Sequence, residues 1–129
     1  MFPVKRPTAV LAAALLAAGA LATAPAPASA TSAAACPAGY FCVWTGPNFT
    51  GQRFTFSGDD EEWESAVSHK DTSWANHGVS GPGVKDHVKV YSGRDHTGDV
   101  TLCLAPGQEV AQNRLAAGRG ASSEWTMRC

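Results

Sequence analysis

The sequence predicts an all-β domain made of two Greek-key halves packed as a sandwich, and three observations support this fold class. Short runs of alternating apolar and polar residues recur, separated by glycine, proline, asparagine and aspartate, and the helical period is nearly absent after residue 30. One nine-residue pattern occurs twice, at a spacing of 47 residues. All four cysteines lie after residue 30, which favours two disulfides in a small exported domain.

The first 30 residues have the features of a secretory signal peptide. Lys5 and Arg6 form a short positive region, residues 9–22 form an apolar run, and Ala28-Ser29-Ala30 is a small-residue cleavage site. The apolar run is too short and too rich in alanine for a membrane span. We therefore predict a secreted protein whose mature chain, residues 31–129, forms a single small domain.

The charge balance argues against nucleic acid and anionic membranes as partners. The sequence has ten Lys and Arg against eleven Asp and Glu, and without Lys5 and Arg6 the net charge is near −3. No cluster of basic residues occurs that could follow a phosphate backbone. We expect a monomer that binds neither nucleic acid nor membrane.

The repeated pattern predicts the same folded turn in each half of the chain. Residues 43–51 and 90–98 both begin with valine, a large aromatic residue, a small hydroxyl residue and glycine, and both end in Thr-Gly. We expect a strand, a turn and a second strand in each copy, with Gly51 and Gly98 at positive φ.

Each copy of the pattern belongs to a half-motif, roughly residues 36–80 and 84–129. A hydroxyl-rich step then leads to a tryptophan in each half, at residues 72–74 and 122–125. Halves of roughly 45 residues, each with about four short strands, predict two Greek keys packed face to face. Residues 110–117 are the one stretch that could form a short helix.

The turns and the start of the domain resemble known families. The aromatic-x4-aromatic-x-Gly turn of the βγ-crystallin Greek key occurs in both copies, with histidine as the second ring of the second copy: Trp44, Phe49 and Gly51, then Tyr91, His96 and Gly98. Phe49 and His96 would cover the glycine backbone. The opening Cys-Pro-Ala-Gly-Tyr-Phe-Cys of residues 36–42 resembles the secreted streptomycete metalloproteinase inhibitor family. This resemblance implies a βγ-crystallin-like fold with two disulfides and an extracellular proteinase as partner.

We predict the disulfides Cys36–Cys42 and Cys103–Cys129. Five residues separate the first pair, whereas thioredoxin-like and zinc motifs have two, and no helix N-terminus or cation is expected beside it to lower a thiol pKa. A redox or metal role for this pair is the alternative. The second disulfide would tie the final strand to the hairpin of the second half and close a loop of about 25 residues.

The resemblance to βγ-crystallins also raises the question of calcium. That family often binds calcium through an Asn/Asp pair just before a hydroxyl pair, where this sequence has Ser68-His69 and Gly118-Arg119. Neither pair supplies a carboxylate or amide oxygen, and the acidic run at residues 59–64 lacks the spacing of a calcium loop. The four histidines lack the spacing of a zinc site. We predict no metal site and no cofactor.

Catalytic chemistry is not predicted, because no nucleophile, base or carboxylate pair lies in a context that would hold it. A rigid domain is suited instead to presenting a loop at low entropic cost. The inhibitor family carries its inhibitory loop after a cysteine in the second half, and thermolysin-like enzymes favour a bulky apolar residue after the scissile bond. The resemblance therefore implies a reactive loop of Cys103, Leu104 and Ala105, cleavable at Cys103–Leu104.

Two alternatives remain. Leu102 and Leu104 could instead be alternate core residues of an ordinary strand. The family closes its loop with a short disulfide, whereas residues 105–128 contain no cysteine, so the loop here is expected to be less constrained. We predict a secreted inhibitor of thermolysin-like metalloproteinases. The alternative is a non-inhibitory βγ-crystallin-like secreted binding or stress module with weak calcium affinity.

Overall fold

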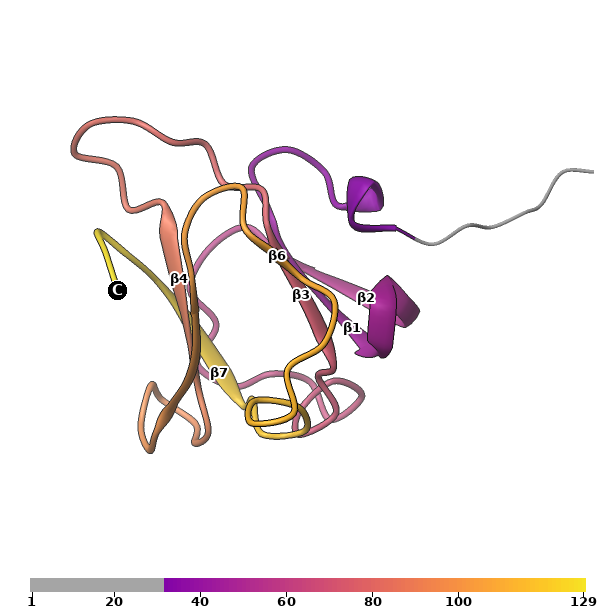
Figure 1. Ribbon diagram of the computed structural model, residues 1–129. Coiled ribbons are helices and arrows are strands. Elements are labelled where there is room, and N and C mark those ends of the chain that lie inside the picture. Colours follow the sequence, from indigo (N-terminus) through magenta and orange to yellow (C-terminus); the bar gives the residue numbers. More distant parts are fainter. Residues whose placement is uncertain (1–31) are drawn as a thin grey trace, which may run out of the picture. The chain divides into compact units, whose positions relative to one another are not determined.

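The computed structural model describes residues 32–129, which belong to one compact unit (Figure 1). The predicted signal peptide lies outside the described residues. Two antiparallel sheets and two short 3-10 turns make up the regular structure of the described part, which confirms the predicted all-β class. The elements are η1 Ala33–Ala35, β1 Phe41–Gly46, η2 Pro47–Phe49, β2 Thr50–Phe56, β3 Ser73–Asn76, β4 His87–Tyr91, β5 Val100–Leu104, β6 Glu109–Val110 and β7 Ser122–Thr126.

The two halves of the chain exchange segments between their sheets. The first sheet has the order β2-β1-β3-β6 and the second has the order β5-β4-β7. Strand β6 comes from the second half but pairs with β3 of the first, where Trp74 lies opposite Val110. In return, Asp60 of the first half forms an isolated antiparallel bridge with Ser123 in β7. The Greek keys therefore interlock, and neither sheet is complete without a segment from the other half.

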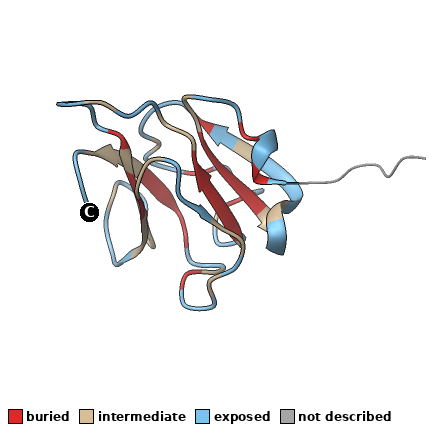
Figure 2. Cartoon of the chain, turned by 45° about the horizontal axis from the view of Figure 1, so that its top comes forward, coloured by how far each residue is buried: buried red, intermediate tan, exposed pale blue. Residues whose placement is uncertain are grey.

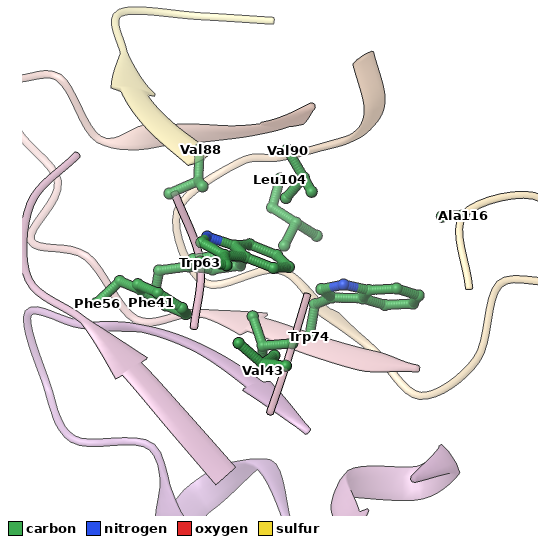
Figure 3. Close-up of a cluster of buried hydrophobic side chains, with 10 residues drawn as sticks. Phe41, Val43, Phe56, Trp63, Trp74, Val88, Val90, Leu104 and Ala116 are labelled. Atoms are coloured by element: carbon green, nitrogen blue, oxygen red, sulfur yellow. The ribbon is translucent and has the colours of Figure 1, made fainter. Parts of the chain in front are cut away.

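One hydrophobic core fills the space between the two sheets. Trp63, from the long connection between β2 and β3, lies in the middle of this cluster (Figure 3), and its ring stacks on Phe56 at 5.3 Å between centroids. Side chains from both sheets surround it and are almost fully buried: Phe41, Val43, Trp74, Val88, Val90 and Leu104. Burial of such side chains supplies most of the driving force for folding.

The first strand is buried on both faces. Phe41 and Val43 point into the main core, whereas Cys42 and Trp44 belong to a second cluster with Ala33, Cys36 and Ala75. The Cys36–Cys42 disulfide closes the N-terminal segment onto this cluster. Double-sided burial explains why residues 41–44 read as a continuous apolar run, since only a strand with one solvated face needs to alternate.

The short helix considered for residues 110–117 is absent, so that possibility was wrong. Val110 ends β6, and the residues after it form turns. The Asn113 side chain accepts hydrogen bonds from the Leu115 and Ala116 amides at 2.9 and 3.3 Å. Asparagine favours such local turns over a helix because its side chain competes for backbone donors.

Candidate functional site

The folded turn occurs at the same place in each half. Two consecutive left-handed residues and a glycine of positive φ build each copy: Asn48, Phe49 and Gly51 (φ 55, 60 and 80°), and Asp95, His96 and Gly98 (φ 55, 56 and 81°). A side chain on either glycine would be strained, because residues that carry a Cβ resist this region. The two turns are therefore rigid corners of the scaffold.

The aromatic rings pack against each other within each corner. The Trp44 and Phe49 rings lie 5.1 Å apart edge to face, and the Tyr91 and His96 rings lie 5.5 Å apart. The atoms nearest the open side of the glycines belong to hydroxyl residues: an added Cβ would lie 2.5 Å from Thr45 Oγ1 at Gly51 and 2.5 Å from Ser92 Oγ at Gly98. These hydroxyls, more closely than the Phe49 and His96 rings, fill the space that a side chain would need.

One buried serine fixes each corner from the neighbouring strand. Ser73 Oγ accepts from the Phe49 amide at 3.0 Å and donates to the Gly46 carbonyl at 2.7 Å. Ser122 Oγ makes the equivalent bonds to His96 and Gly93, at 3.1 and 2.7 Å. Ser122, and not Ser123, is thus the counterpart of Ser73, which shifts the alignment of the halves by one residue.

With this alignment, the second pair that corresponds to a βγ-crystallin calcium site lies one residue earlier than Gly118-Arg119. Counted back from Ser73 and Ser122, the corresponding pairs are Ser68-His69 and Ala117-Gly118. Ala117-Gly118 supplies no side-chain oxygen, and hard cations require oxygen ligands. Within residues 32–129, no group of three or more His, Cys, Asp or Glu side chains could hold a metal ion.

Two ionisable groups with raised pKa values take part in structural hydrogen bonds. Asp71 Oδ2 accepts from Trp74 Nε1 and Asp71 Oδ1 from the Gly120 amide, both at 2.9 Å, and burial raises the pKa of this carboxyl. Burial and the hydrogen bond to Glu124 raise the pKa of Tyr91 to about 12. These hydrogen bonds connect segments of the fold: Asp71 joins β3 to the residues before β7, and Tyr91 joins β4 to β7.

The predicted reactive bond lies at the end of β5. Cys103 is bonded to Cys129, as predicted, but the Leu104 side chain is fully buried and lies opposite Val88. The Leu104 carbonyl accepts from Asn76 Nδ2 at 3.0 Å. In this structure Leu104 is a core residue, which is the arrangement that the ordinary-strand alternative describes. A proteinase would reach its side chain only if β5 left the sheet, so the reactive bond at Cys103–Leu104 stays a prediction.

A tight turn follows the predicted bond. The Gln108 amide donates to the Ala105 carbonyl at 3.0 Å, and Gly107 has φ 84°. The Gln108 side chain in turn accepts from the Ala105 amide at 2.9 Å. Ala105 is only partly exposed and its backbone is engaged within this turn, so little of the predicted reactive loop is open to a partner.

The connection between β3 and β4 exposes apolar side chains that the sequence analysis did not single out. Its residues 78–85 are exposed or half-exposed, and Val79 and Val84 expose 68% and 41% of their surface. Figure 2 shows this segment, at the upper left, in the colours of exposed and intermediate residues. Two valines among glycine, serine and proline could have indicated an apolar contact loop, because turn-forming stretches are otherwise polar.

The double Greek-key arrangement is that of a βγ-crystallin domain. Three similar solved structures have TM-scores just above 0.5. A βγ-crystallin from an archaeon is 21% identical (TM-score 0.54) and covers 69% of this chain and 99% of its own. A βγ-crystallin from Ciona intestinalis is 12% identical (TM-score 0.53), with 67% and 99% covered. The fifth crystallin domain of the non-lens protein Absent in melanoma 1 is 20% identical (TM-score 0.52), with 76% and 91% covered.

Within this fold class, the sequence itself defines the family. The chain belongs to peptidase inhibitor family I36, whose model matches residues 29–103. The resemblance of the opening motif to an inhibitor family is thereby confirmed, and the chain is grouped with peptidase inhibitors and not with enzymes. No curated protein matches the sequence.

Proposed function

We propose that the chain is a secreted inhibitor of extracellular metalloproteinases of the thermolysin type. The single observation that carries this proposal is the family match, which places the chain among peptidase inhibitors. The interlocked halves, the rigid corners and the two disulfides support it, because a preorganised domain loses little conformational entropy when it binds. Secretion fits the disulfides as well, since such bonds persist in oxidising compartments. No helix within residues 32–129 is long and apolar enough to cross a membrane.

Thermolysin-like enzymes are the favoured target because they select a bulky apolar residue after the scissile bond. The chain presents such residues at its surface, among them Leu115 and Val79. The predicted reactive bond Cys103–Leu104 offers another, with the burial of Leu104 as its obstacle. Nothing in the described residues favours the alternative of a calcium-binding module, since neither corresponding pair supplies a set of oxygen ligands.

Titration of purified residues 31–129 against a panel of proteinases tests the proposal. We expect stoichiometric inhibition of a thermolysin-like metalloproteinase at about micromolar protein or below, and weak or no inhibition of serine proteinases. The matched control is the same chain reduced and alkylated at its four cysteines, which should lose inhibition as the fold loosens. Absence of inhibition of every class would refute the proposed function, and inhibition confined to serine proteinases would refute its metalloproteinase part.

A further inference from the structure

We propose that the connection between β3 and β4, residues 77–86, is the segment that enters the proteinase active site, with Val79 as its main apolar contact. This inference rests on the proposed function and names the surface that performs it. Figure 1 shows the connection as an open loop that projects beyond the strands it joins. We refer to it as the brace loop, because buried side chains hold both of its ends.

The brace loop offers what an active-site cleft binds. Val79 is 68% exposed although it is a branched apolar residue. In the described part of the chain, Val79 and Ser80 make no backbone–backbone hydrogen bond, so their N–H and C=O groups face no competing partner within the domain. Free backbone groups beside an apolar side chain allow a segment to pair with an enzyme as an added strand.

One buried side chain holds both ends of the loop. Asn76 is fully buried, and its Oδ1 accepts from the Gly78 amide at 2.8 Å. Its Nδ2 donates to the Asp86 carbonyl at 2.8 Å. Residues on the two sides of the loop are thereby tied through a single amide group in the core. Such a connection fixes the separation of the ends and lowers the entropy that binding would cost.

The Asp86 carboxylate braces the loop from within. Its Oδ2 accepts from the Ser80 hydroxyl at 3.1 Å and from the Gly81 amide at 3.4 Å, and its Oδ1 contacts His87 Nδ1 at 2.8 Å. A turn closes the tip, where the Val84 amide donates to the Gly81 carbonyl at 3.2 Å. These bonds leave Val79 as the more exposed of the two valines on a segment of limited freedom.

The base of the loop rests directly on an aromatic ring. A Cβ added to Gly78 would lie 2.5 Å from the Trp125 ring, so only glycine allows this contact. A shallow groove runs between the loop and β7, lined by Val79, Val84 and Trp125 among others. The rim of a proteinase cleft is the occupant that the family match indicates for this apolar groove.

Other exposed apolar side chains fit a cleft less well. Leu115 is 82% exposed, but the residues around it form turns, with the Ala116 and Ala117 amides bonded to the Asn113 carbonyl. Val100 is 48% exposed but lies in β5, whose backbone is paired with β4. The turn around Leu115 cannot pair with an enzyme without unfolding locally, whereas β5 is paired on one side only, so Val100 offers the edge of a strand and not a projecting loop.

Inhibition constants of two matched variants test the inference. Val79→Asp should raise the inhibition constant for a thermolysin-like metalloproteinase by about tenfold or more, since it places a carboxylate without a partner in an apolar contact. Val100→Asp, an exposed valine outside the loop, should leave the constant within about twofold. Both variants should unfold at the same temperature as the unmodified chain, and Val84→Asp provides a second substitution in the loop.

The outcomes separate this inference from the proposed function. If the unmodified chain inhibits, and Val79→Asp and Val84→Asp inhibit equally well, the brace loop does not enter the active site. The inference is then overturned, while the inhibitor function stands. If Val100→Asp weakens inhibition as much as Val79→Asp, the effect belongs to added charge and the inference is also overturned. If the unmodified chain inhibits no proteinase, the proposed function is refuted, and the role proposed for the brace loop is refuted with it.

Discussion

Leu104→Ala lowers the free energy of unfolding by about 2–5 kcal/mol. The Leu104 side chain is fully buried and belongs to the core between the sheets, together with Val88 and Val90. Its truncation removes buried methyl groups and leaves a cavity that the surrounding strands can fill only in part. Chemical denaturation of the purified domain measures the change.

Leu115→Ala is the matched control for this substitution. It removes the same atoms from a side chain that is 82% exposed, so we expect a change within about 0.5 kcal/mol. The two variants also decide how Leu104 acts. If Leu104→Ala were as stable as Leu115→Ala and yet lost inhibition, Leu104 would be an exposed reactive residue and its place in the core would be contradicted.

Removal of the second disulfide in the double variant Cys103→Ala, Cys129→Ala lowers the free energy of unfolding by about 3 kcal/mol. The disulfide joins residues 26 positions apart, and the loss of such a link gives the unfolded chain this much additional freedom in the loop-closure estimate. Cys129 is exposed and Cys103 only half-buried, so little packing is lost with the two sulfurs. Urea denaturation of the oxidised proteins measures the difference.

A reductant provides the control for the double variant. When all disulfides are reduced in both proteins, the free energies of unfolding of the double variant and of the unmodified chain should differ by less than about 0.5 kcal/mol. A difference that persisted under reduction would show that the substitutions act through packing. Equal stabilities of the two oxidised proteins would contradict a stabilising role for this disulfide.

The sequence predicted those parts of the fold that depend on residues close together in the chain. Gly51 and Gly98 adopt positive φ, and the short spacing from Cys36 to Cys42 suits a closed loop, so neighbouring residues carry enough information. The exchange of β6 between the halves has no such local cause. Two residues, Glu109 and Val110, form this strand, and their partner is set by packing with distant residues.

The site was harder to predict than the scaffold. The alternating positions of Leu102 and Leu104 are compatible both with an extended inhibitory loop and with a core strand. The pairing of β5 with β4 shows that the segment is a strand in this structure. Likewise, two serines stand side by side at residues 122 and 123, and the sequence does not show which of them holds the turn. The hydrogen bond from the His96 amide identifies Ser122. The brace of Asn76 on the loop ends also depends on contacts that sequence spacing does not show.

The central claim is that this domain inhibits by occupying a proteinase active site. The most direct measurement is calorimetric titration of residues 31–129 into a thermolysin-like metalloproteinase, with and without a small ligand that fills the active site. We predict one domain bound per enzyme molecule, and no binding once the small ligand is present. Binding that the small ligand leaves unchanged, or the absence of binding to the free enzyme, would contradict the claim.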